Sequence, residues 1–168
     1  MNRPLLLVTA LAATLLLSAC QPGQEEGDAQ AAQAVPLAPA GTDDAAWKTY
    51  LGQVIGQNMD GITERTFNYY LPAGTDPTEV DGPYSRMMTE VRTVLQRGVL
   101  PGNMLSFSSP NSTMMADLIV QAFEDESIQD TALKGSRVLF VGASKDESRV
   151  RQAALSAGAD FRFVEIKR

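Results

Sequence analysis

The sequence lacks most of the side chains that enzymes use for acid–base and nucleophilic catalysis. It contains no histidine and a single cysteine, Cys20. This excludes Ser-His-Asp and Cys-His catalysis, histidine metal sites and the usual proton shuttle near neutral pH. The G-x-S-x-G turn and the glycine-rich patterns of dinucleotide and phosphate sites are also missing from the sequence. We therefore expect a protein that is not an enzyme and uses no cofactor or metal.

Two loops keep polar groups that could bind a small anion. Ser109, Asn111 and Ser112 follow one predicted strand, and Ser144 and Lys145 follow another. In parallel α/β sheets, ligands bind at the carboxyl ends of strands, where helix N-termini offer free N–H groups. These five residues form the candidate ligand site, to which Lys145 adds positive charge. The alternative is that they only cap the helices that follow them.

The amino terminus has the pattern of a secretory signal. Arg3 precedes an apolar run from Leu5 to Leu17, which is too short to span a bilayer, because a spanning helix takes about 20 residues. The run ends in L-S-A-C at 17–20, which resembles the lipobox of bacterial lipoproteins. That resemblance implies that residues 1–19 are cut off as a signal peptide and that Cys20 is acylated with fatty acids such as palmitate. The alternative is an ordinary signal peptide with a cysteine at this place by chance.

The residues after Cys20 predict a tether and a location. Gln21 stands where inner-membrane lipoproteins often have Asp, so the resemblance implies attachment to the outer membrane, on its periplasmic face, in a host with two membranes. Residues 20–44 are rich in Gln, Ala, Pro, Gly and acids and contain no base, which predicts a disordered acidic linker. The remainder, 45–168, is close to neutral and gives no sign of a nucleic-acid-binding face.

Residues 45–168 alternate between helical and extended patterns. Apolar residues recur at helical spacing from Trp47 to Met59, and three further helical segments separate four extended ones. The predicted strands cover residues 66–71, 104–107, 138–141 and 161–166. This alternation predicts a small three-layer α/β domain with a mainly parallel four-stranded sheet and helices on both faces.

Local signals predict the helix boundaries. Pro83 and Gly98 are expected to bound the second helix. Ser109, followed by proline, and Ser144, in a capping-box pattern, are expected to be the N-caps of the third and fourth. Gly52 and Gly56 in the first helix predict close packing on the sheet. The acids at 124–126 are expected to be a solvated surface, with a calcium site as the alternative.

A second resemblance concerns the strands themselves. R-T-F-N-Y-Y-L-P-A-G at 65–74 is similar to an early strand of α/β-hydrolase esterases, and residues 138–166 resemble the end of that fold. In the family, an acid after such a strand orients the catalytic histidine, and Asp146 matches that acid. Because this sequence has neither a histidine nor a nucleophile elbow, the resemblance implies related strand–loop–helix packing, not an active hydrolase.

Three functions remain open on these observations. The first is a non-catalytic envelope lipoprotein whose domain binds a protein or cell-wall partner. The second is a domain that binds a small anionic ligand at the strand ends, and the third is a degenerate α/β-hydrolase-like protein. An exposed apolar patch away from the strand ends would favour the first, and a polar crevice of ligand size would favour the second.

Overall fold

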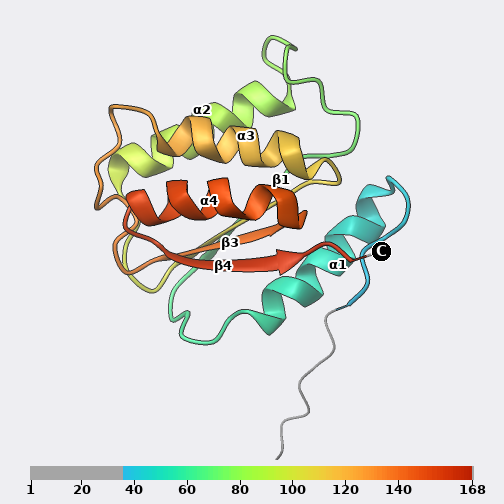
Figure 1. Ribbon diagram of the computed structural model, residues 1–168, viewed down its shortest axis with the longest axis horizontal. Helices are drawn as coiled ribbons and strands as arrows, with labels where there is room; N and C mark the ends of the chain where they lie inside the picture. Colours follow the sequence, from blue (N-terminus) through green and yellow to red (C-terminus); the bar gives the residue numbers. More distant parts are fainter. Residues whose placement is uncertain (1–35, 168) are drawn as a thin grey trace, which may run out of the picture. The chain divides into compact units, whose positions relative to one another are not determined.

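The computed structural model describes residues 36–167. The predicted signal peptide, Cys20 and residues 21–35 lie outside the described residues. Helices and strands alternate along the chain (Figure 1), in the order α1 Asp44–Gln57, β1 Thr66–Tyr70, α2 Pro83–Arg97, β2 Met104–Ser108, α3 Ser112–Phe123, β3 Arg137–Gly142, α4 Ser144–Ser156 and β4 Asp160–Glu165. The predicted α/β class is confirmed.

The four strands form one sheet in the order β1-β2-β3-β4, and all three pairings are parallel. Each strand therefore lies beside its neighbour in sequence, connected through one helix. The direction of this winding never reverses, so the sheet lacks the topological switch point at which doubly wound folds open a ligand crevice. This weakens the positional argument for a small-ligand site.

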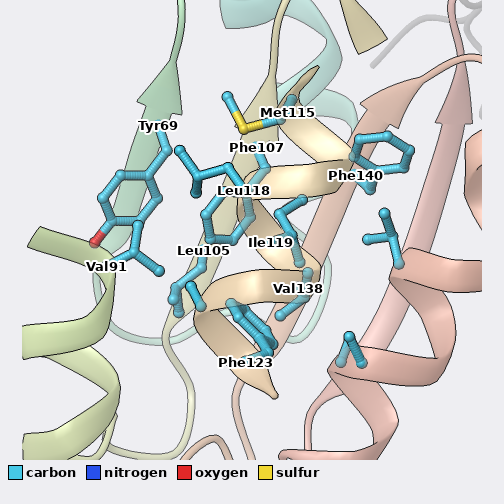
Figure 2. Packing of buried hydrophobic residues seen from close by; sticks show 14 of the residues in the cluster. Tyr69, Val91, Leu105, Phe107, Met115, Leu118, Ile119, Phe123, Val138 and Phe140 are labelled. Atoms are coloured by element: carbon cyan, nitrogen blue, oxygen red, sulfur yellow. The ribbon is translucent and has the colours of Figure 1, made fainter. Parts of the chain in front are cut away.

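Two apolar clusters cover the two faces of the sheet. The larger cluster joins α2, α3 and α4 to one face, with Phe107 and Phe140 fully buried. Figure 2 shows Ile119 of α3 between the side chains of these two aromatic residues. The smaller cluster packs α1 against the other face and is centred on Trp47, which is also fully buried. Helices therefore cover both faces, as predicted.

The glycines of α1 do not pack on the sheet, so the prediction for them is wrong. Gly52 and Gly56 are exposed, and a Cβ atom added at either position would meet no atom within 4 Å. The buried side of α1 is instead made by Trp47, Tyr50 and Leu51, together with Val54. The two glycines lie on the solvent side of the helix, where side-chain packing does not require them.

The structure corrects the predicted starts of α3 and α4. The N-cap of α3 is Asn111, whose Oδ1 accepts a 3.2 Å hydrogen bond from the Met114 N–H, so Ser109 lies ahead of the helix. The N-cap of α4 is Ala143, which has no side chain that could cap, and Ser144 is the first helical residue. The predictions for α2 are confirmed, because Pro83 begins the helix and Gly98 ends it with φ 74°.

The described chain makes contacts ahead of residue 45, where the sequence places the start of the domain. Ala38 is buried, and its N–H donates to the Lys167 carbonyl over 2.9 Å. The Trp47 indole N–H donates to the Gly41 carbonyl over 2.8 Å. The segment from Ala38 to α1 thus belongs to the packed domain. Within residues 36–167, no helix has the length and apolar character needed to cross a membrane.

Candidate functional site

The carboxyl ends of β2 and β3 are joined by one serine. Ser112, the first residue of α3, donates from Oγ to Asp146 Oδ2 over 2.8 Å and accepts from the Ala143 N–H over 2.7 Å. Both Ser112 and Asp146 are buried, so the hydrogen bond between them forms away from water, and the bond from the Ala143 N–H is partly buried. Ser112 therefore holds the start of α4 to the start of α3.

Arg149 of α4 completes this arrangement. Its guanidinium donates to Asp146 Oδ1 over 2.8 Å and to the Thr113 carbonyl over 3.1 Å, and it also pairs with Asp117 of α3. Burial alone would raise the pKa of the Asp146 carboxyl. The hydrogen bonds from Arg149 and Ser112 outweigh this effect, so the pKa of Asp146 lies below its ordinary value.

These contacts argue against an acid–base role for Asp146. A general acid or base works best when its pKa lies near the working pH, and this carboxyl is shifted in the opposite direction. Its two oxygens already accept from Ser112, Thr113 and Arg149. The arrangement fits a structural connection between α3 and α4.

The structure brings the predicted ligand residues together at the carboxyl ends of the strands, but most of them form hydrogen bonds within the domain. Ser109 is buried and accepts from the Asn111 N–H over 3.1 Å, and Asn111 in turn caps α3. Ser112 is bonded to Asp146. Ser144 and Lys145 are exposed at the first turn of α4. Lys145 forms no salt bridge within residues 36–167.

A shallow hollow of about 460 Å³ lies at the carboxyl ends of the strands, and we call it the carboxyl-end hollow. It is lined by Pro110, Asn111, Ser112, Thr113, Ala143, Lys145 and Ile166. Lys145 is the one charged residue of this lining. The acids Asp146 and Glu147 occupy the first turn of α4 and offset the positive end of that helix. An anion would therefore meet less attraction here than the sequence suggests.

A second hollow of about 450 Å³ lies at the opposite end of the strands, beside the amino ends of β1 and β2. Sequence reasoning missed this amino-end hollow. Its apolar residues come from β1, the last turn of α2 and the loop that follows, and its full lining is Glu64, Arg65, Phe67, Val94, Arg97, Gly98, Val99, Leu100 and Asn103. Leu100 is 76% exposed, a large fraction for an aliphatic side chain.

A local signal could have drawn attention to this region. Val99, Leu100 and Pro101 follow the end of α2 at Gly98, and a run of apolar residues in a turn is unusual because loops lie in water. The companion residues Phe67 and Val94 come from other elements, so no spacing along the chain could have connected them to Leu100.

No family model matches the chain, and no match was found among curated proteins or solved structures.

No cluster of three or more potential metal-ligating side chains is present among residues 36–167. The acids at 124–126 follow α3, and Asp125 is engaged by Arg92 and by Ser127. Since the comparisons found no match, we infer the function from the geometry of the two hollows.

Proposed function

We propose that this protein is a lipid-anchored component of the bacterial cell envelope that binds a protein or cell-wall partner without catalysis. The L-S-A-C pattern at 17–20 supports the anchor, with Cys20 as the acylated residue and Gln21 favouring the outer membrane. Several acyl chains on one residue hold a protein firmly, because each buried CH₂ adds about 0.8 kcal/mol. The domain then lies on the periplasmic face.

The amino-end hollow is the observation that carries the binding function. It combines an exposed aliphatic residue, Leu100, with the half-buried side chains of Phe67, Val94 and Val99. An apolar hollow with a polar rim is typical of a surface that another macromolecule covers. It also lies away from the carboxyl ends of the strands, which favours a macromolecular partner over a small ligand.

The other two functions have weaker support. A small anion at the carboxyl-end hollow would have Lys145 as its one cation, with Ser109 and Ser112 used for internal bonds. A degenerate hydrolase would use Asp146 to orient a histidine, and the sequence contains no histidine. The hydrogen bonds from Ser112 and Arg149 to Asp146 support a structural role for that acid.

The test compares two single changes of exposed leucines. Leu100→Glu places a charge in the amino-end hollow, and Leu155→Glu places one on α4, where the leucine is 55% exposed. Each variant and the wild type are crosslinked in native membranes and extracted, and the attached proteins and cell-wall fragments are quantified. We expect Leu100→Glu to lose at least tenfold of a specific adduct that Leu155→Glu retains. Identical adducts in all three proteins would contradict a partner at this hollow.

A further inference from the structure

The outer edge of β1 presents unpaired backbone groups. The Met104 N–H donates to the Arg65 carbonyl over 2.9 Å, and the Leu71 N–H donates to the Ser108 carbonyl over 3.2 Å. Because backbone groups of alternate residues point to opposite sides of a strand, Thr66, Asn68 and Tyr70 direct their N–H and C=O groups away from β2. Within residues 36–167, none of these outward groups forms a backbone hydrogen bond.

The two edges of the sheet differ in their protection against another strand. Natural edge strands carry charges or proline that discourage pairing. β4 follows this rule, since it contains Asp160, Arg162 and Glu165. β1 contains no charged residue and no proline over Thr66–Tyr70. The β1 edge is therefore the one that is open to an additional strand.

The amino-end hollow continues from this edge. Phe67 of β1 and Val94 of α2 both line it, and both are half-buried. In Figure 2, α2 lies toward the outer side of β1, and the Tyr69 ring of β1 points toward Val91 of α2. A strand added beside β1 would lie next to this flank of α2, where side chains on one of its faces would meet apolar surface.

The rim of the hollow indicates the charge of its occupant. Arg65 and Arg97 both line it, against the single acid Glu64. Neither arginine forms a salt bridge within the described chain. Five other arginines of the domain are paired, among them Arg137, Arg149 and Arg162, while Arg86 forms no salt bridge within residues 36–167. Two unpaired guanidinium groups beside an apolar hollow favour an acidic side chain on the partner.

We propose that the β1 edge and the amino-end hollow together bind an extended segment of a partner protein, which pairs with β1 as a fifth strand. The outward groups of Thr66, Asn68 and Tyr70 supply the backbone hydrogen bonds. An aliphatic side chain of the segment enters the hollow, and an acidic one meets Arg65 and Arg97. This inference rests on the proposed binding function, for which it specifies the partner as an extended acidic–aliphatic peptide.

The test is a selection of a random-peptide library, displayed on phage, against the full chain in detergent. We expect enriched peptides with alternating aliphatic residues and at least one acid. A synthetic copy of the most enriched peptide is then measured against two proline variants. Asn68→Pro removes one outward N–H of β1 and should weaken binding at least tenfold. It also removes the 2.7 Å hydrogen bond that Asn68 Oδ1 accepts from Ser106 of β2, so Asn68→Ala, which loses only that side-chain bond, is the matched control and should bind like wild type. Glu165→Pro, which removes an outward N–H of the β4 edge, should leave binding unchanged.

Two further readings keep the result independent of misfolding. A peptide N-methylated at alternate residues leaves the protein intact and should also lose at least tenfold in affinity. Amide hydrogen exchange should show new protection at Thr66, Asn68 and Tyr70 and little change at Phe67. No enriched peptide, or equal binding to Asn68→Pro and wild type, would overturn strand addition. If a peptide depends on Leu100 but not on Asn68, strand addition fails while the proposed binding function stands.

Discussion

Ser112 and Asp146, from the first turns of two different helices, share a 2.8 Å hydrogen bond in a position closed to water. Ser112 also accepts from the Ala143 N–H, so a single hydroxyl satisfies a buried carboxylate and a partly buried N–H. Because buried polar groups are costly when unpaired, this contact fixes how α4 sits beside α3. It also gives the carboxyl ends of the strands a structural role before any ligand is considered.

Removing the carboxylate should destabilise the domain. Asp146→Ala leaves Ser112 and Arg149 without their shared partner, and we expect the free energy of unfolding to fall by about 2–4 kcal/mol. We expect a loss near the lower end of this range, because the Arg149 side chain is 36% exposed and water can solvate its charge once the carboxylate is removed. Urea denaturation followed by fluorescence of Trp47, the one tryptophan, measures the change. Lys145→Ala, an exposed neighbour, is the control, and equal stability of both variants would argue against this role.

The same carboxylate predicts a dependence of stability on pH. The pKa of Asp146 is lower in the folded protein than the ordinary Asp value of about 3.9, so the unfolded state binds more protons in this range. Its stabilising effect is therefore complete above about pH 5 and is lost as the pH falls through the folded pKa. The stability difference between wild type and Asp146→Asn should shrink between about pH 5 and pH 2. A difference that stays constant over this range would be inconsistent with the lowered pKa.

The exposed glycines of α1 should be replaceable with a gain in stability. Gly52 and Gly56 are helical and face open space, and glycine costs about 0.5–1 kcal/mol relative to alanine in a helix. Gly52→Ala and Gly56→Ala should each stabilise the domain by up to that amount in urea denaturation. Gly142→Ala is the contrast, because its Cβ would overlap the Phe140 ring and lie 2.8 Å from Ser112 Oγ. Destabilisation by both α1 changes would mean that this face packs against something.

The class of fold, but not the detail of the strand ends, could be predicted from the sequence. The four strands and their helices follow from local patterns such as the apolar run of β3 and the stop at Gly98. Asp146 and Ser112 lie 34 residues apart, and only the packing of α3 on α4 brings them together. The same hydrogen bonding shows why Ser144 is not a cap. Ala143 already begins the helix, because its N–H is held by Ser112 and its carbonyl accepts from Asp146.

Small-ligand binding and partner binding predict different effects of small anions on the melting temperature. Lys145 lies at the proposed ligand site and therefore distinguishes them. The proposed function expects that phosphorylated and carboxylated envelope metabolites leave the melting temperature unchanged, because Ser109, Asn111 and Ser112 are engaged internally. A thermal-shift screen of wild type and Lys145→Glu measures this. A ligand that raises the melting temperature of wild type but not of Lys145→Glu would establish the carboxyl-end hollow as a site. It would also displace partner binding as the leading function.

The most direct test of the proposed lipid anchor is a measurement of acylation at Cys20. Cells expressing wild type, Cys20→Ala or Ser18→Ala are grown with an alkyne analogue of palmitate, and the protein is isolated and assayed for label and size. We expect label and a mature form in wild type and in Ser18→Ala, which keeps a small residue in the lipobox-like segment. Cys20→Ala should show neither. A Cys20→Ala protein that matures, carries the label and extracts with the membrane would contradict the lipid-anchored account.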